Sequence, residues 1–194
     1  MTFIRNEKDI IAFIQEDEWM VDLLTCAKSL NLPDWWICAG FVRSKIWDVQ
    51  HGFDERTAMR DIDVIYYDPE NNEESFEKKH EDTLKGLLST APWSVKNQAR
   101  MHIANNSSPY SSSVDAIEKF PETATALGVK LDEKDHVILV APHGIQDAVN
   151  LLVKPTPYFL ESKDRMLMYQ KRVREKNWQA IWSDIEVMNL DLIK

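Results

Sequence analysis

The stretch WWICAGFVRSKIWDVQHGFDERTAMRDIDVIYYD, residues 35–68, places a glycine and two closely spaced aspartates between apolar runs. Its first run, 35–39, predicts a short buried strand, and the apolar periodicity from Phe41 to near Gly52 predicts a helix. The second run, 61–67, is rich in Ile, Val and Tyr and predicts another strand. A strand, a glycine turn, a helix and a strand therefore follow one another.

Composition is consistent with one globular domain over residues 1–194, because 44% of the residues are hydrophobic and 28% are charged. The net charge of -9 argues against binding to a long nucleic acid, which needs a basic surface. It leaves room for a small basic pocket that holds a nucleotide. No signal peptide and no apolar run of about 20 residues is present, so we expect a cytoplasmic location without membrane association.

The remaining patterns predict an α+β fold, a small mixed sheet flanked by helices. A helical N-terminal segment covers 1–32, with Asn6 capping a helix from Glu7 and a second helix over 18–30. A helical C-terminal segment covers 158–194. The other expected elements are helices over 73–88, 145–152, 161–176 and 178–187, a strand over 94–103 with one polar face, and a hairpin of 127–131 with 136–141.

A strand that ends at glycine before a helix can bind an anion. The first backbone N–H groups of the helix have no intrahelical partner, and Gly40 lets a phosphate approach the backbone. Arg43 lies in the first predicted turn and Lys45 in the second, so both are candidates to bind phosphate. A single glycine before a helix is a weak signal, since many strand–helix turns look alike.

Asp61 and Asp63 make the signal more specific. Residues two apart on a strand point to the same side, so the two carboxylates repel unless a proton or a cation intervenes. Mg²⁺ prefers one or two carboxylates with phosphate oxygens and water. The alternative is a surface pair with Arg60 as a casual ion partner; the position between apolar residues, behind a glycine turn and helix, favours the metal site.

The combined motifs resemble the nucleotidyltransferase fold shared with DNA polymerase β, and more closely a bacterial nucleotidyltransferase-like family of unknown function. The resemblance covers roughly residues 19–157. The residues that carry it are Gly40, Arg43, Trp47, His51-Gly52, Asp61-Ile62-Asp63-Val64, Tyr67-Asp68, Trp93, the run 95–102, Pro121 to Thr125, Ala141 to Gly144, and Asp147. It implies this fold and nucleotidyl transfer that depends on one or two Mg²⁺ ions, with Asp61 and Asp63 as metal ligands and catalytic residues.

The sequence departs from the superfamily pattern in three places. Phe41 follows Gly40, where the superfamily has a second small residue, and the spacing from Gly40 to Asp61 leaves room for an extra loop. The strand predicted over 94–103 has no third carboxylate; Asn97 is a candidate for that face, and Asp115 or Asp147 could reach in from elsewhere.

Basic residues also mark the predicted strand 94–103. Lys96, Arg100 and His102 share one face of it, where they line the pocket of an anionic ligand or form a solvated polar face. With Asn97, Arg100 completes the set of candidate nucleotide-binding residues.

Two functions follow. The first is Mg²⁺-dependent transfer of a nucleoside monophosphate from a nucleoside triphosphate to a small-molecule or protein acceptor. The second is a catalytically attenuated protein that binds a nucleotide or a partner protein.

Overall fold

The computed structural model describes residues 3–188 and begins with two helices that the sequence predicted. They are α1 (Glu7–Gln15) and α2 (Glu18–Ser29). The side chain of Asn6 accepts a hydrogen bond from Asp9 N–H, and the Asp9 carboxylate accepts one from the backbone N–H of Asn6, so a capping box starts α1. Residues 1–2 and 189–194 of the predicted terminal helical segments lie outside the described part of the chain.

A mixed five-stranded sheet, with the order β3-β2-β1-β4-β5, forms the centre. Its strands are β1 (Trp36–Cys38), β2 (Ile62–Tyr66), β3 (Trp93–Asn97), β4 (Gly128–Leu131) and β5 (Val137–Val140). β2 and β3 are parallel, and the other neighbours are antiparallel. The predicted hairpin of β4 with β5 and the predicted small mixed sheet are confirmed.

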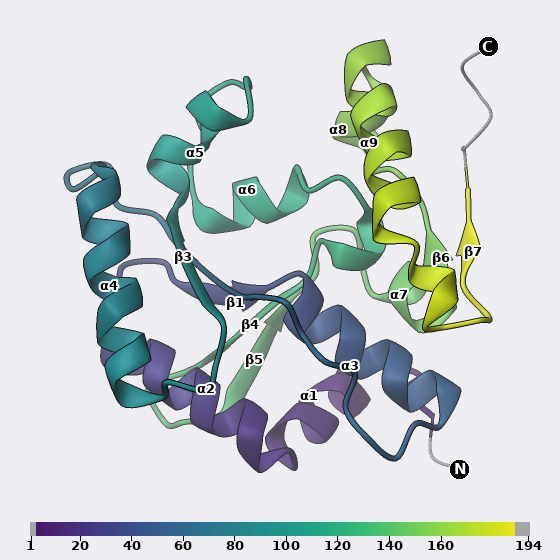
Figure 1. Ribbon diagram of the computed structural model, residues 1–194, viewed down its shortest axis with the longest axis horizontal. Helices are drawn as coiled ribbons and strands as arrows, with labels where there is room; N and C mark the ends of the chain where they lie inside the picture. The colour runs from purple at the N-terminus through teal and green to yellow at the C-terminus, as the bar shows by residue number, and fades with distance from the viewer. Residues whose placement is uncertain (1–2, 189–194) are drawn as a thin grey trace.

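Helix α3 (Gly40–His51) connects β1 to β2 and ends at Gly52, whose φ of 67° suits glycine. Its buried residues join α1, α2 and one face of the sheet in a hydrophobic core that runs from Ile4 to Ile185. On the other face, Trp36 and Cys38 of β1 pack against Ile117 of α6 (Ser113–Glu118). Figure 1 shows α6 and α5 (Gln98–Ala104) on that side, α1 and α2 on the opposite side, and α4 (Glu74–Leu87) along the β3 edge.

The predicted strand over 94–103 is correct only in its first half. The alternating burial of β3 stops at Asn97, whose side-chain oxygen accepts a hydrogen bond from Ala99 N–H and caps α5. The period-2 pattern of residues 98–103 is therefore accidental. These residues form a helix that leaves Ile103 72% exposed.

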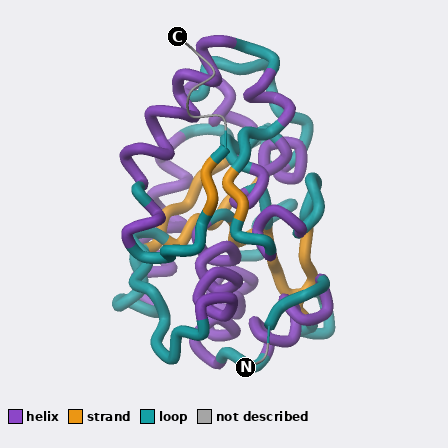
Figure 2. The backbone as a smooth tube through the Cα atoms, turned by 90° about the vertical axis from the view of Figure 1, so that its right-hand side faces the viewer, coloured by secondary structure: helices purple, strands orange, loops and turns teal. Residues whose placement is uncertain are grey.

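The chain after β5 packs, together with a short segment before β4, as a layer beside the sheet (Figures 1 and 2), and we call these elements the C-terminal layer. It contains the 3-10 helix η1 (Thr123–Thr125), α7 (Gln146–Val149), β6 (Leu152–Val153), α8 (Pro157–Leu160), α9 (Lys163–Lys176), the 3-10 helix η2 (Trp178–Ala180) and β7 (Glu186–Val187). The predicted helix over 145–152 is shorter because the chain turns at Leu151, with φ of 60°, into β6.

The predicted helix over 178–187 is wrong. Asn177 takes the left-handed conformation and ends α9, and only one 3-10 turn follows. Trp178 and Trp182 then turn inward against Trp47, and Gln179 Nε2 donates to the Ile185 carbonyl at 2.8 Å. Burial of the two indoles therefore outweighs helix propensity here. No helix within residues 3–188 is long and apolar enough to cross a membrane.

Candidate active site

The turn between β1 and α3 is built on an unusual backbone conformation at Ala39. Its φ of 55° and ψ of -115° lie in a region that favours glycine, and Ala39 N–H donates to the Leu127 carbonyl at 3.0 Å. No side chain caps α3, so the amides of its first turn remain available to a ligand. The side chain of Phe41 is fully buried in the hydrophobic core, so the two small residues of the turn are Ala39 and Gly40.

The side chain of Arg43, a residue of α3, packs against three tryptophan rings. Its guanidinium carbon lies 4.8, 5.0 and 5.7 Å from the ring centroids of Trp47, Trp178 and Trp182. The side chain is 91% buried; Nη2 donates to Ser44 Oγ at 3.1 Å, while Nε has no hydrogen-bond partner. Burial, opposed mainly by Glu122, lowers the pKa of Arg43 to about 10.

The guanidinium of Arg43 faces the glycine of the turn. A Cβ atom at Gly40 would lie 3.5 Å from Arg43 Nη2, so the charge sits beside the first turn of the helix. Helix amides and a fixed cation therefore meet at one point, which is a suitable place for an anion.

Asp61 directly precedes β2, and Asp63, its second residue, lies on the side of the sheet that Cys38 occupies. Asp63 pairs with Cys38 in β1 and with Ser94 in β3. Asp61 is exposed and Asp63 half-buried, and neither side chain forms an ion pair within residues 3–188. The aspartate pair thus keeps its capacity to accept ligands.

The negative charges of the two carboxylates repel each other. Burial, together with the negative charge of Asp61, raises the pKa of Asp63 to about 6, although a hydrogen bond from Ser94 and the charges of Lys176 and Arg172 act in the opposite direction. Burial and the charges of both aspartates also raise the pKa of the Cys38 thiol. A cation near the pair would relieve this repulsion.

A small pocket of about 100 Å³ joins these features. Gly40, Arg43 and Asp61 line it together with the loop 57–60 that precedes Asp61. The opposite wall comes from the C-terminal third: Lys176, Trp178, Ile181 and Trp182. Sequence reasoning missed this wall, and the spacing of the two tryptophans was the available signal, although it was interpreted as a helix.

Lys45 lies outside this pocket. It points to the other side of α3, where its ammonium contacts Asp17 Oδ2 at 2.9 Å. Arg56 contacts Asp17 Oδ1 at 2.6 Å and stacks 4.0 Å from the ring of Trp19. These contacts connect α2, α3 and the loop after α3, so Lys45 has a structural role.

Asn97 and Arg100 are also apart from the aspartate pair, since Asn97 is paired with Tyr66 at the far end of β2. The Asn97 side chain is fully buried and donates to the Asp68 carbonyl at 2.7 Å. Arg100 makes two hydrogen bonds to the buried carboxylate of Glu77, at 3.1 and 2.8 Å. Both residues secure the β3–α5 junction.

Among residues 3–188, no third carboxylate joins the aspartate pair in a cluster that could hold a metal ion. The β3 residue beside Asp63 is Ser94. Asp115 binds Lys119 at 2.7 Å, and Asp147 binds Lys154 at 2.7 Å, each in its own local network. Within residues 3–188 no cluster of three or more His, Cys, Asp or Glu side chains is suited to hold a metal ion.

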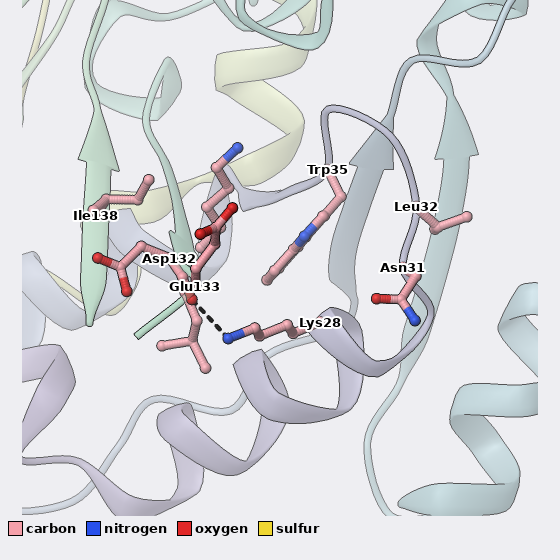
Figure 3. A pocket seen from close by; sticks show the side chains of 9 residues that line it. Lys28, Asn31, Leu32, Trp35, Asp132, Glu133 and Ile138 are labelled. Atoms are coloured by element: carbon pink, nitrogen blue, oxygen red, sulfur yellow. Dashed lines mark hydrogen bonds between the residues drawn. The ribbon is translucent and has the colours of Figure 1, made fainter. Parts of the chain in front are cut away.

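A larger hollow of about 430 Å³ lies elsewhere, between α2 and the β4–β5 hairpin (Figure 3). Lys28 crosses it and donates to the Asp132 carbonyl at 2.6 Å, as the dashed line in Figure 3 marks. It contains neither the glycine turn nor the aspartate pair. The smaller pocket is therefore the candidate site, despite the difference in volume.

Comparison with known proteins identifies the family and the fold. A family described as nucleotidyltransferase matches residues 25–187. A protein whose NMR structure is described as revealing a CCA-adding enzyme head domain is 38% identical, with a TM-score of 0.85, over 96% of this chain and 97% of the other. No curated protein matches the sequence.

Two CCA-adding enzymes share the fold at lower identity. One, in complex with ATP, is 17% identical with a TM-score of 0.52; the chain covers 43% of it with 91% of its own length. The Thermotoga maritima enzyme, in complex with tRNA, is 15% identical with a TM-score of 0.53; the chain covers 44% of it with 97% of its own length. The chain thus spans less than half of these enzymes.

The predicted polymerase β-like fold is confirmed by these matches. Since the family covers most of the sequence and a relative of 38% identity covers nearly all of it, the chain belongs to the nucleotidyltransferase family.

Proposed function

We propose that this protein transfers a nucleoside monophosphate from a nucleoside triphosphate to a small-molecule or protein acceptor, in a reaction that depends on Mg²⁺. One observation carries the proposal. Two carboxylates without ion-pair partners in the described chain lie next to a pocket formed by the uncapped start of α3 and a buried arginine.

The aspartate pair fits Mg²⁺ by the chemistry of its donor atoms. Oxygen ligands suit this ion, and two carboxylates with phosphate oxygens and water complete its preferred octahedron. Burial and the charge of Asp61 raise the pKa of Asp63, so a cation beside the pair would be favoured electrostatically. Asp61 and Asp63 would hold the ion, which when bound neutralises phosphate charge and lowers the pKa of an attacking hydroxyl.

The other pocket residues position the phosphates. The open surface of Gly40 admits a phosphate to the amides of α3, and Arg43 supplies a positive charge that the tryptophans keep in place. At about 100 Å³ the pocket is well below the roughly 300 Å³ of a complete small-molecule site, so it accommodates phosphates and leaves the base outside.

The acidic surface guides the choice of acceptor. With a net charge of -9 the chain repels a polyanion, so we favour a small molecule or a protein over a long nucleic acid. Relatives of this fold are described in complexes with ATP, CTP and tRNA, which makes tRNA the informative comparison in an acceptor screen.

Ligand-dependent thermal denaturation tests the site. MgCl₂ with ATP, CTP, GTP or UTP should raise the Tm of the wild type through preferential binding to the folded state. The Asp61→Asn/Asp63→Asn variant should lose this shift, whereas the Asp54→Asn variant, changed in the exposed loop after α3, should keep it. An undiminished shift in the double variant would place the ligand elsewhere.

Release of pyrophosphate tests the reaction. Each labelled nucleoside triphosphate is incubated with MgCl₂ and with small hydroxyl compounds, proteins or tRNA, and labelled product is followed together with pyrophosphate. Transfer to a small molecule or protein, and its loss in Asp61→Asn, supports the proposal. Transfer to tRNA alone would overturn the proposed acceptor class.

A binding protein without catalysis is the second candidate function. It is favoured by Ser94, which places a hydroxyl where a third carboxylate would face Asp63. This candidate predicts the Mg²⁺-dependent Tm shift without any release of pyrophosphate. The same two measurements therefore separate the enzyme from the binding protein.

A further inference from the structure

Two cations of α9 face the aspartate pair from the C-terminal layer. Lys176 lines the same pocket as Gly40 and Asp61. Arg172 lies one helical turn earlier, so both side chains share a face of α9. Lys176 and Arg172 both act on the charge of Asp63, although more than 100 positions separate them from it in the sequence.

The end of α9 is held firmly enough to define this position. Asn177, with φ of 44° and ψ of 48°, ends the helix directly after Lys176. Trp178 then enters the core, where it is 5% exposed and packs 5.6 Å from the ring of Trp47 in α3. Lys176 is thus placed between a capped helix end and a buried anchor.

The pocket gathers positive charge on a protein that is acidic overall. Partial desolvation of its ammonium and the positive charge of Arg172 lower the pKa of Lys176, although the residue is exposed overall; Asp61 opposes this, and Arg43 and Arg60 lower it further. Lys176, Arg172, Arg43 and Arg60 thus influence one another's charge near the aspartate pair, while Glu122 offsets part of the charge of Arg172 and Arg43. When a divalent ion occupies the carboxylates, the cations are left with an excess of charge that a polyanion would neutralise.

The two α9 cations differ in how free they are. Arg172 Nε contacts the fully buried carboxylate of Glu122 at 2.7 Å, so part of its charge is used inside the protein. Lys176 is exposed and forms no ion pair with any residue in the range 3–188. Its ammonium keeps three donors for a ligand.

We infer that Lys176, supported by Arg172, binds the terminal phosphates of the nucleoside triphosphate and the pyrophosphate released from it. α9 would then close the phosphate site on the side opposite the start of α3. This inference rests on the proposed function and adds a specific role for α9, which the sequence analysis identified only as a helix.

Titration calorimetry with inorganic pyrophosphate and MgCl₂ tests the inference. The Lys176→Met variant should bind pyrophosphate about tenfold more weakly than the wild type, because it loses one charge-assisted hydrogen bond. The Lys176→Arg variant should retain most of the affinity because it keeps the charge. The matched control is Lys171→Met on the same helix, since Lys171 is 75% exposed, forms an ion pair with Glu175 and does not line the pocket; the pyrophosphate affinity of this variant should be that of the wild type.

The second measurement compares the affinities of nucleotides that carry different numbers of phosphates. Lys176→Met should weaken binding of a nucleoside triphosphate much more than that of the corresponding monophosphate, because only the former carries the terminal phosphates. Circular dichroism should give the same Tm for Lys176→Met and wild type. Equal losses for both nucleotides would overturn the assignment to the terminal phosphates.

The outcomes distinguish this inference from the proposed function. If the wild type transfers nucleotide and Lys176→Met matches it in pyrophosphate affinity and in KM, the inference is wrong and the proposed function stands. If pyrophosphate binding depends on Lys176 but no acceptor is modified, the phosphate site stands and transfer is wrong.

Discussion

The indole N–H of Trp182 donates to Asp48 Oδ1 at 2.8 Å and joins two parts of the chain that lie 134 residues apart. The same carboxylate accepts hydrogen bonds from the backbone N–H and the hydroxyl of Thr57, at 2.9 and 2.6 Å. Asp48 thereby connects α3, the loop that leads to Asp61, and the C-terminal layer. The Asp48 carboxylate thus links Thr57 and Trp182, which both line the pocket.

Loss of the indole donor should destabilise the protein. In the Trp182→Phe variant the buried Asp48 loses one of three hydrogen bonds, which should lower the free energy of unfolding by about 2 kcal/mol. Urea denaturation followed by circular dichroism measures the change. The control is Ser183→Ala, a substitution of an exposed neighbour, which should stay within about 0.5 kcal/mol of wild type. A Trp182→Phe variant as stable as this control would contradict the structural role of the contact.

Replacing Arg43 should separate stability from ligand binding. The guanidinium is buried with an unpartnered Nε, and its pKa is lowered to about 10 mainly by burial, so the charge is costly in the folded state. Arg43→Met removes this cost and keeps contact with the tryptophans. We expect a Tm at least equal to that of wild type and weaker binding of pyrophosphate with MgCl₂. A Tm lower by several degrees would show that the cation–π contacts outweigh the burial cost.

Stability without metal should depend on pH through Asp63. Its pKa is raised to about 6, by burial first and by Asp61 second, from the ordinary value of 3.8. Between these values the folded state binds more protons than the unfolded state, so this contribution is full below pH 4 and is lost as pH rises through 6. In EDTA, the free energy of unfolding of Asp63→Asn should therefore rise by on the order of 2 kcal/mol relative to that of wild type as the pH increases from 4 to 7.

Urea denaturation of both proteins at intervals across that range provides the measurement. Asp61→Asn serves as the companion variant, because removal of its charge should shift the midpoint for Asp63 to lower pH. A constant difference between wild type and Asp63→Asn at all pH values would contradict the raised pKa.

The turn before α3 should accept glycine at Ala39. Relief of the unfavourable φ of 55° should exceed the extra entropy of glycine in the unfolded chain, so we expect Ala39→Gly to stabilise the protein by about 0.5–1 kcal/mol. The matched control is Ala12→Gly in the exposed middle of α1, which should lose about 1 kcal/mol. Thermal denaturation of both variants tests the opposite signs, and a destabilised Ala39→Gly would show that the turn is unstrained.

Local patterns predicted much of the fold because the relevant forces act over a few residues. The Asn6 cap, the helix from Gly40 to His51 and the strand before Tyr67 all follow from capping, periodicity and β-branched composition. The same reasoning failed after Asn97 and after Asn177. At each point a side-chain contact or a left-handed residue ended one pattern while the sequence continued to fit it.

The sequence likewise predicted some residues of the candidate site and missed others. Gly40 and the spacing of Asp61 and Asp63 were visible in the sequence, since a turn, a helix start and a strand place those groups through short-range geometry. Whether Lys45 or Lys176 faces them was decided by packing: Asp17 engages Lys45, and the burial of Trp178 and Trp182 brings α9 to the pocket. Contacts between distant segments depend on the sum of many apolar burials across the core, and no local pattern of residues encodes that sum.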